Sequence, residues 1–266
     1  MASRSVLITG ASSGIGAACA TRLAGKGWQV FAGVRKPGDR PEGTTEVLLD
    51  VTDADAIARA AETVGDRLDG LVDNAGIAVA APLEHLPLDE LRRQLEVNVI
   101  GQLAVTQALL PALRAAQGRV VIVGSIAGKS ALPFLGAYAI SKFGLEAMAD
   151  SLRVELEPDG MHVSLVEPGT IATAIWTKPQ PVADTLPPEA VERYGARIEK
   201  FRKLAAKRSA NAAPVESVAE AVEHALTADP PRTRYLVGRD ARIRATLERL
   251  PDRTRDRILR RVLLGG

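Results

Sequence analysis

The sequence predicts an α/β fold, in which short apolar strands alternate with helices along the chain. Ser5–Thr9 form an apolar run that leads into a glycine-rich turn, and a helical pattern follows at Ala17–Ala24. Length and composition agree, because 266 residues with 46% hydrophobic and 25% charged residues are ordinary for a globular α/β domain. We therefore expect one domain over residues 1–266, without internal repeats.

Seven short apolar runs have the length and the flanking turn residues of buried strands, at residues 5–9, 29–34, 47–49, 70–72, 120–123, 162–166 and 235–237. Helical patterns lie between or after them, at residues 17–24, 53–66, 88–115, 137–156, 188–207, 215–227 and 240–264. Thr52 or Asp53 is placed to cap the second helix, and Pro251 breaks the last one. The third helix has a weak point at Val97–Gly101, where β-branched residues, an asparagine and a glycine lie together.

Composition also limits the location and the ligands of the protein. The single Cys19, in a predicted helix, excludes an intrachain disulfide and is expected to be a buried small residue. No apolar stretch approaches the ~18 residues of a spanning helix, and the N-terminus lacks the pattern of a signal peptide. We therefore expect no transmembrane segment and a cytoplasmic protein. The three histidines have no Cys, Asp or Glu at metal-ligand spacing, so we predict no metal.

The formal net charge of +2 conceals a basic C-terminal tail. From Arg232 onward the chain has eleven Arg and four acidic residues, a net charge of +7, so the preceding residues carry about −5. Because no nucleic-acid motif is present, residues 239–266 are expected to form a solvated helical tail, and no nucleic-acid partner is predicted. A peripheral contact with a membrane surface or another anionic partner is the alternative.

Residues 174–213 interrupt the alternation of strands and helices. A proline-rich run, Lys178-Pro179-Gln180-Pro181 with Pro187-Pro188, precedes the charged helical pattern of residues 188–207. Long insertions between core elements often cover a binding site. We expect this insertion to be a substrate lid.

The turn Thr9-Gly10-Ala11-Ser12-Ser13-Gly14-Ile15-Gly16 predicts a dinucleotide-binding site. It follows the first strand directly and opens the first helix. Glycines in such a turn let the backbone bend sharply and approach a pyrophosphate, while the free amides and the dipole of the helix N-terminus favour negative charge.

The residues after the second strand predict which nicotinamide cofactor is preferred. In dinucleotide-binding folds an acidic residue there binds the ribose hydroxyls, whereas an arginine accommodates a 2′-phosphate. Val34 occupies the place of the acid, and Arg35-Lys36 follow it. Because a guanidinium binds phosphate in a bidentate manner, we predict NADP(H), with NAD(H) as the alternative cofactor. The alternative is that Arg35 is an ordinary surface arginine in a loop, without a role in cofactor binding.

Ser125, Tyr138 and Lys142 are the candidate catalytic residues. Ser125 follows a buried strand, at the edge where open α/β sheets place their ligands. Tyr138 and Lys142 are four residues apart on one predicted helix, so both side chains lie on one face. We expect the ammonium to lower the pKa of the phenol, which could then exchange a proton with an alcohol or carbonyl oxygen. Taken alone, such a pair is more often a half-exposed aromatic with a solvated lysine.

Several motifs together resemble the short-chain dehydrogenase/reductase family. The glycine spacing of residues 9–16 resembles the family's Thr-Gly-x-x-x-Gly-x-Gly turn. The other matches follow in the family's order, over about residues 4–175, at Asp73-Asn74-Ala75-Gly76, Asn98, Ser125, Tyr138-x-x-x-Lys142 and Pro168-Gly169-Thr170-Ile171-Ala172-Thr173. Many members carry a second asparagine where this chain has Asp73. The Arg35 loop and the run from Ser141 to Glu146 look like the steroid and retinol dehydrogenase branch.

The resemblance implies a single doubly wound Rossmann-type domain with a parallel sheet of about seven strands. It implies that Tyr138 is the general acid or base, that Ser125 binds the substrate oxygen and that Lys142 binds the nicotinamide ribose. Asn98 would mark a local helix distortion that completes a proton relay. With the turn and loop described above, the implied cofactor-binding residues are Gly10, Ser12, Ser13, Gly14, Ile15, Gly16, Arg35, Asp50, Val51, Asn74, Ala75, Gly76, Tyr138, Lys142, Pro168, Gly169, Ile171 and Thr173.

The predicted activity is the NADP(H)-dependent interconversion of an alcohol and a carbonyl. The apolar residues 131–135 and Ala174-Ile175-Trp176 are expected to flank the reacting carbon, which favours a bulky apolar substrate of steroid, retinoid or long-chain type. The alternative is that they pack against the lid and the core. A non-catalytic dinucleotide sensor and a sugar-nucleotide epimerase or dehydratase of the same superfamily are the rival functions. We also expect a homodimer or homotetramer.

Overall fold

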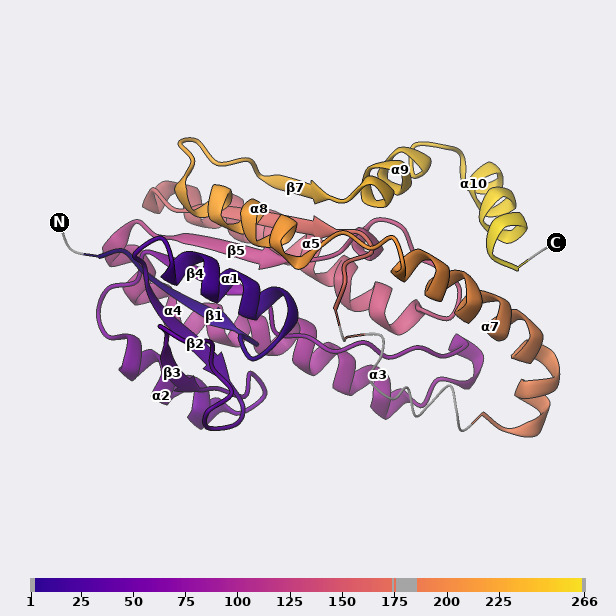
Figure 1. Ribbon diagram of the computed structural model, residues 1–266, viewed down its shortest axis with the longest axis horizontal. Coiled ribbons are helices and arrows are strands. Elements are labelled where there is room, and N and C mark those ends of the chain that lie inside the picture. The colour runs from indigo at the N-terminus through magenta and orange to yellow at the C-terminus, as the bar shows by residue number, and fades with distance from the viewer. Residues whose placement is uncertain (1–2, 174, 176–185, 265–266) are drawn as a thin grey trace.

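A parallel sheet of seven strands forms the centre of the protein, in the order β3-β2-β1-β4-β5-β6-β7. The computed structural model describes residues 3–173, 175 and 186–264 (Figure 1). The strands are β1 Ser5–Thr9, β2 Gln29–Val34, β3 Thr45–Leu48, β4 Gly70–Asp73, β5 Arg119–Val123, β6 His162–Pro168 and β7 Arg234–Val237. The predicted fold class, a doubly wound Rossmann-type sheet, is confirmed.

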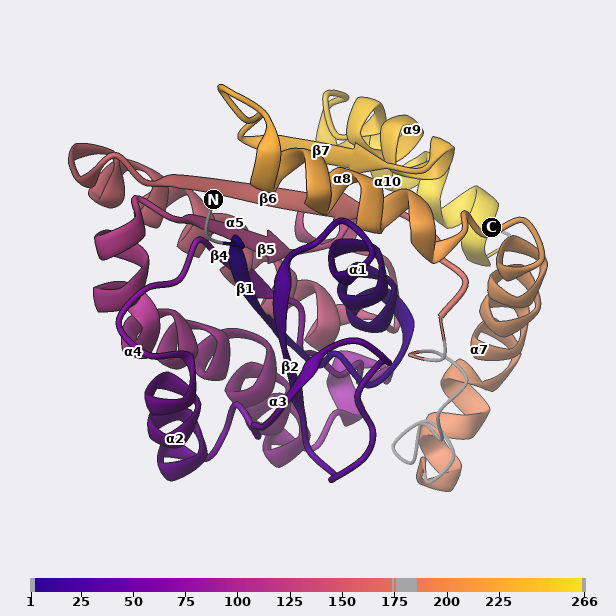
Figure 2. The same ribbon diagram turned by 60° about the vertical axis from the view of Figure 1, so that its left-hand side comes forward.

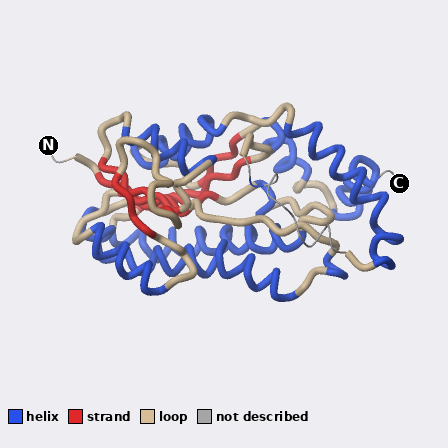
Figure 3. The backbone as a smooth tube through the Cα atoms, turned by 60° about the horizontal axis from the view of Figure 1, so that its bottom comes forward, coloured by secondary structure: helices blue, strands red, loops and turns tan. Residues whose placement is uncertain are grey.

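Helices cover both faces of the sheet, and Figure 3 shows the strands between two helical layers. One face is covered by α1 (Gly14–Ala24) and α8 (Val215–Thr227), which also pack on each other (Figure 2). The other face is covered by α2 (Ala54–Val64), α4 (Gly101–Ala116) and α5 (Gly136–Leu156). The strand order reverses between the neighbouring strands β1 and β4. Doubly wound folds bind ligands at this point, outside the carboxyl ends of the strands.

Alternate side chains of the central strands enter two separate cores. Leu7 packs with residues of α2, α4 and α5, whereas Val6 and Ile8 pack with residues of α1 and α8. Because the strands are buried on both faces, they are continuous apolar runs rather than alternating ones. Cys19 lies fully buried in the second core, where burial raises the pKa of its thiol to about 12. The predicted role of Cys19 as a buried small residue is confirmed.

Two helix starts show how local sequence places the elements. α1 begins at Gly14, three residues before the predicted start, because the glycine-rich turn itself supplies the first helical turn. α2 begins after Asp53, whose Oδ1 accepts hydrogen bonds from the backbone N–H of Asp55 at 2.9 Å and of Ala56 at 3.1 Å. Of the two caps considered for α2, the structure therefore selects Asp53.

The third predicted helix is continuous but distorted in its middle. α3 (Leu88–Leu95) passes through a π-helical turn, Glu96–Ile100, into α4, which confirms the predicted weak point. By length and composition alone, Leu88–Ala116 could cross a membrane, so the expectation that no such stretch exists was wrong. In the fold, Val105, Leu109 and Leu113 of this helix pack into the core beneath the sheet, which accounts for its apolar character.

The C-terminal part folds against the body beyond the carboxyl edge of the sheet (Figures 1 and 2). It consists of α7 (Pro188–Ser209), α9 (Arg239–Leu247), α10 (Asp252–Leu259) and a last π-helical turn, Arg260–Leu264, which contacts α7. The predicted break at Pro251 is confirmed. The expectation of a solvated tail was wrong, because Ala241 and Leu263 are fully buried against neighbouring elements. Of the predicted lid, residues 174 and 176–185 lie outside the described residues.

Candidate active site

The turn between β1 and α1 brings the backbone close to itself at the carboxyl edge of the sheet. Gly10 has φ +65°, a left-handed conformation that favours glycine. A Cβ atom at Gly16 would lie 2.3 Å from the carbonyl oxygen of Gly10, so a larger residue would displace the turn. Ser13 precedes α1 and makes no side-chain cap. The first-turn amides are thus left for a ligand, and the helix dipole favours an anion there.

Asn74 connects this turn to the end of β4. Its Nδ2 donates hydrogen bonds to the carbonyl oxygens of Thr9 at 2.9 Å and Gly10 at 3.3 Å. The Thr9 hydroxyl oxygen accepts from the backbone N–H of both Asn74 and Ala75, each at 2.9 Å. The two turns thereby form one connected unit at the point where the strand order reverses.

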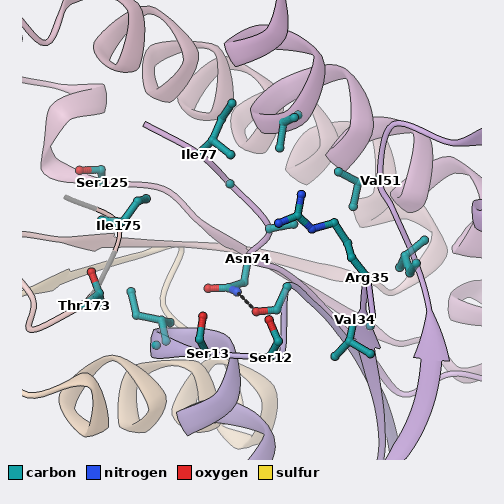
Figure 4. A pocket seen from close by; sticks show the side chains of 18 of the residues that line it. Ser12, Ser13, Val34, Arg35, Val51, Asn74, Ile77, Ser125, Thr173 and Ile175 are labelled. Carbon is teal, nitrogen blue, oxygen red and sulfur yellow. Dashed lines mark hydrogen bonds between the residues drawn. The ribbon is translucent and has the colours of Figure 1, made fainter. Parts of the chain in front are cut away.

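A pocket of about 500 Å³ opens above these turns (Figure 4). Most of the predicted site residues line it, namely Gly10, Ser12, Ser13, Gly14, Ile15, Arg35, Asp50, Val51, Asn74, Ala75, Gly76, Ser125, Tyr138, Pro168, Gly169, Ile171 and Thr173. Three predicted site residues do not line the pocket: Gly16, Asn98 and Lys142. Gly16 packs against the back of the glycine-rich turn. Asn98 and Lys142 lie beneath Ser125 and Tyr138, the residues that form the catalytic edge of the pocket.

Arg35 extends from the end of β2 into the pocket (Figure 4). Val34 is buried and uncharged, so the position directly before the arginine carries no carboxylate. After the neighbouring strand β3, Asp50 accepts hydrogen bonds from the backbone N–H of Thr52 at 3.0 Å and from its hydroxyl at 2.7 Å. These bonds, together with the charge of Arg35, hold the pKa of Asp50 below its ordinary value.

Ser125 and Tyr138 meet at the end of β5. The Ser125 hydroxyl oxygen accepts a hydrogen bond from the backbone N–H of Ala127 at 3.1 Å, which fixes its position. Tyr138 lies buried in the first turn of α5. Burial raises the pKa of Tyr138 above its ordinary value, while a hydrogen bond with Ser125 and the charge of Arg244 oppose this rise. The expected net lowering of the pKa by Lys142 was therefore wrong.

Lys142 shares a helix face with Tyr138, as predicted, but its ammonium is directed to the backbone of β5. Its Nζ donates a hydrogen bond to the carbonyl oxygen of Val123 at 2.9 Å and lies 5.7 Å from the centroid of the Tyr138 ring. Burial lowers the pKa of Lys142 to about 8. The ammonium therefore faces the ring of the tyrosine, and its own charged form is weakened by desolvation.

Asn98 lies fully buried in the π-helical turn. Its Oδ1 accepts from the backbone N–H of Ile77 at 2.8 Å, and its Nδ2 donates to the Ile77 carbonyl oxygen at 3.0 Å and to the Ser141 hydroxyl at 3.1 Å. The side chain therefore fixes the segment that follows Gly76 and does not bond its own backbone. A role of Asn98 in proton relay stays a prediction.

The segment Pro168–Thr173 is held over the pocket by the C-terminal part of the chain. The backbone N–H of Gly169 donates to the carbonyl oxygen of Val237 at 2.8 Å. The backbone N–H and the hydroxyl of Thr170 both donate to Asp240 Oδ2, each at 2.8 Å. Sequence reasoning missed Asp240. The available signal was an acidic residue three positions after the last strand, within a basic tail.

Sequence reasoning also missed Arg244. It lies one helical turn after Asp240 on α9, and its Nη2 donates a hydrogen bond to the carbonyl oxygen of Ser130. Burial lowers the pKa of Arg244 to about 10, and its charge favours the ionised form of Tyr138. Helix α9 thus contacts both the Pro168–Thr173 segment and the residues from Ser125 to Tyr138, which we call the catalytic segment. Part of the basic tail therefore belongs to the site.

The apolar residues predicted to flank the reacting carbon occupy different environments. Ile175 lines the pocket (Figure 4). Phe134 packs edge-on against two aromatic side chains of α7, with ring centroids 6.3 Å and 5.7 Å apart, as the alternative of packing against the lid predicted. Leu132 lines a second cavity. Ala174 and Trp176 lie outside the described residues.

Histidines take no part in a metal centre within the described part of the chain. No group of three or more His, Cys, Asp or Glu side chains there could hold a metal ion. His224 Nδ1 instead lies 2.9 Å from the hydroxyl of Tyr235, which joins α8 to β7.

A parallel sheet of this order, with a glycine-rich turn where the order reverses, defines a dinucleotide-binding protein of the doubly wound class. Residues 4–182 match the family model described as short chain dehydrogenase. An NADPH-dependent 3-dehydrocapnine reductase of Ornithobacterium rhinotracheale is 37% identical, over 96% of this chain and 95% of its own length. Retinol dehydrogenase 5 of Mus musculus is 38% identical, over 90% and 81%.

Solved structures agree with the family match. A short chain dehydrogenase of Burkholderia cenocepacia, in complex with NADP, has a TM-score of 0.76 and 27% identity, covering 99% of this chain and 98% of its own. A 3-oxoacyl-(acyl-carrier protein) reductase of Brucella melitensis, solved with bound NAD, has a TM-score of 0.68 and 26% identity, covering 88% of this chain and 88% of its own. The protein belongs to the short-chain dehydrogenase/reductase family. It is an NAD(P)-dependent oxidoreductase that interconverts an alcohol and a carbonyl, and its relatives come from several branches of the family.

Proposed function

We propose that this enzyme prefers NADP(H) and acts on a bulky apolar alcohol or carbonyl substrate. The observation that carries the cofactor preference is Arg35, whose guanidinium extends into the pocket while the buried, uncharged Val34 occupies the place of an acid. A 2′-phosphate carries close to two negative charges, and a guanidinium binds it in a bidentate manner. An NAD-binding site would instead use a carboxylate at this place.

The residues of the pocket fit a nicotinamide dinucleotide. The Gly10–Gly16 approach leaves no space for a Cβ atom, and the uncapped first turn of α1 presents amides to a pyrophosphate. The Pro168–Thr173 segment, held by Asp240, lines the same pocket as Ser125 and Tyr138, and its Thr173 lies next to Gly14 of the turn. The cofactor, when bound, supplies or accepts the hydride.

Tyr138 exchanges a proton with the reacting oxygen, and Ser125 forms a hydrogen bond with it. Because burial raises the pKa of Tyr138, its hydroxyl is protonated at neutral pH and is suited to donate a proton to a carbonyl oxygen during reduction. The Ser125 hydroxyl, fixed by Ala127, donates a hydrogen bond to the same oxygen and orients the substrate. In the oxidation direction the phenolate accepts the proton of the alcohol, aided by the charge of Arg244.

Lys142 and Asn98 hold the catalytic edge together. Lys142 is hydrogen-bonded to Val123 of β5, with its Nζ 5.7 Å from the centroid of the Tyr138 ring, and the family resemblance assigns it to a ribose hydroxyl of the cofactor. The amide of Asn98 is used by Ile77, so any proton relay at this position would involve the widened π-helical turn and not the side chain.

An apolar substrate is supported by Ile175, which lines the pocket. Two rival functions make different predictions. A dinucleotide sensor would bind NADPH without turnover, and an epimerase or dehydratase would act on a sugar nucleotide without net consumption of cofactor. Net NADPH consumption with a panel of apolar carbonyl compounds separates all three.

A homo-oligomer is part of the same proposal. The exposed apolar side chains of Ile100, Ile140 and Phe143 lie on packed neighbouring elements, the π-helical turn and α5. An exposed apolar group of this kind is typical of a protein–protein contact.

The cofactor proposal is tested by the double substitution Val34→Asp/Arg35→Ala. Removing the guanidinium and adding a carboxylate should reverse the NADPH/NADH ratio of kcat/KM, because a charge-assisted hydrogen bond contributes ~1.5–3 kcal/mol. Arg40→Ala, in the same loop but outside the pocket, is the control. A wild-type enzyme that already prefers NADH would contradict the proposal.

The catalytic proposal is tested by Tyr138→Phe, which removes only the hydroxyl. Turnover should fall by well over tenfold, a barrier increase above ~1.4 kcal/mol, while the Kd for NADPH stays within about twofold of the wild type. Retention of more than about a tenth of kcat would rule out Tyr138 as the general acid.

A further inference from the structure

A second cavity lies between the C-terminal helices and the catalytic segment. It has a volume of about 650 Å³, within the range of ~300–1,000 Å³ of small-molecule sites. Its walls come from α7, α9, α10 and the last π-helical turn. Leu132, between Ser125 and Tyr138 in the sequence, and Thr170, in the Pro168–Thr173 segment, also line it. The cavity is therefore adjacent to the active site but separate from the dinucleotide pocket.

Most of the residues that line this cavity are aliphatic. Apart from Leu132, the large aliphatic side chains come from four elements; together they are Leu132, Leu204, Ile243, Leu247, Ile258, Leu259, Val262 and Leu263. Aliphatic walls of this kind favour a hydrocarbon chain, because each Å² of apolar surface removed from water contributes about 25 cal/mol. A sugar or another polyhydroxylated ligand would leave its hydroxyl groups without partners against these walls.

Four cations surround the same cavity: Lys207, Arg208, Arg239 and Arg244. The carboxylate that lines the cavity is Asp240, which already accepts two hydrogen bonds from Thr170. No salt bridge joins Lys207, Arg208 or Arg239 to an acidic side chain of the described residues, whereas Arg92, Arg93, Arg153 and Arg255 do form such pairs. The cavity therefore combines an apolar interior with an excess of positive charge at its edge.

Arg244 lines the cavity, and its charge also acts on the catalytic Tyr138. Its Nη2 donates to Ser130, but its Nε is buried without a hydrogen-bond partner among the described residues. A buried guanidinium nitrogen without a partner is costly, and an anion within reach would satisfy it.

From the apolar walls, the unpaired cations and the buried guanidinium, we infer that this cavity binds an anionic amphiphile, a long hydrocarbon chain that ends in a carboxylate. The chain would lie among the leucine and isoleucine side chains, and the carboxylate would contact the cations at the edge, with Arg244 as the innermost. A charge-assisted pair between a guanidinium and a carboxylate is among the strongest polar contacts in proteins. The inference concerns binding, so it does not depend on which substrate the dinucleotide pocket serves.

The test uses the full-length protein saturated with NADPH, at about 0.15 M salt so that nonspecific charge effects are screened. Isothermal titration calorimetry would compare tetradecanoate below its micelle concentration, tetradecan-1-ol as the uncharged chain, and acetate as the anion without a chain. We expect tetradecanoate to bind about tenfold or more tighter than the alcohol, and acetate to give no measurable heat.

Two matched variants assign the binding to the cavity. Lys207→Gln/Arg208→Gln removes two cations of the cavity edge and should weaken tetradecanoate binding by about tenfold or more, with little effect on the alcohol. Arg242→Gln/Arg249→Gln removes two exposed cations of the same basic tail outside the cavity, and its affinity should equal that of the wild type. Circular dichroism and Tm confirm that both variants are folded.

Three results would overturn the inference: no binding of tetradecanoate, equal affinity for the acid and the alcohol, or equal losses in the two double variants. The last would mean a general attraction to a basic surface. Turnover of NADPH is measured separately, so binding of tetradecanoate without turnover would refute the proposed function alone, and turnover without such binding would refute this inference alone.

Discussion

Asp73 offers a sharp test of how burial controls charge next to the cofactor turn. It is fully buried at the end of β4, directly before Asn74, where many family members carry asparagine. The Thr106 hydroxyl lies 2.7 Å from Asp73 Oδ2 and 3.0 Å from the Gln102 carbonyl oxygen, and its single proton can be donated to only one of them. The other carboxylate oxygen, Oδ1, has no hydrogen-bond partner among the described residues.

Burial raises the pKa of Asp73 from an ordinary 3.8 to about 7, although the hydrogen bond from Thr106 opposes the rise. Because the pKa in the folded state is the higher one, the folded protein retains a proton between pH 3.8 and about 7 that the unfolded chain has lost. This residue therefore lowers the free energy of unfolding as the pH rises through that window. At about 1.36 kcal/mol per pKa unit, the full cost above pH 7 is roughly 4 kcal/mol.

Asp73→Asn keeps the shape of the side chain and removes the titration. Its amide can donate to the Thr106 hydroxyl, which leaves the proton of Thr106 for Gln102. The variant should therefore be more stable than the wild type at pH 8, and the difference in the free energy of unfolding should widen by roughly 2–3 kcal/mol between pH 5 and pH 8.

Urea denaturation followed by circular dichroism at both pH values measures this difference. Asp89→Asn, an exposed carboxylate on α3, is the control, and its effect should stay within ~0.5 kcal/mol at either pH. A difference between wild type and Asp73→Asn that does not change with pH, or a variant that is less stable at pH 8, would refute the reasoning. The KM for NADPH should stay unchanged, because Asp73 does not line the pocket.

Two further predictions concern the active site. Because the ammonium of Lys142 is lost as the pH rises through about 8, the KM for NADPH should increase above that pH, and Lys142→Met should remove the inflection; a flat profile in the wild type would contradict the placement of Lys142 at the ribose. Asp240→Ala should raise the KM for NADPH about tenfold with a small change in kcat, because it releases both hydrogen bonds of Thr170. Asp240→Asn should restore most of the affinity, while Asp252→Ala, an exposed carboxylate of α10, should have no effect. A loss of kcat alone in Asp240→Ala would exclude a positioning role.

The sequence by itself determined those features that depend on neighbouring residues. The strands are buried on both faces and therefore appear as continuous apolar runs, and the Asp53 cap and the weak point around Asn98 depend on local backbone chemistry. The glycine-rich turn was also predictable, since only glycine fits at Gly10 and Gly16. The dinucleotide site and the enzyme family could therefore be predicted from the sequence, because their motifs are local.

Only the tertiary structure decided the electrostatics and the outer walls of the site. The pKa of Tyr138 depends on its burial and on Arg244, more than a hundred residues away in the chain, and not chiefly on the neighbouring Lys142. Asp240 and Arg244 belong to a basic segment whose pattern is typical of a solvated surface, and packing on α7 and β7 brings that segment to the catalytic edge. Burial and long-range contacts have no local pattern in the sequence, which is why the second cavity and its cations became visible only in the folded protein.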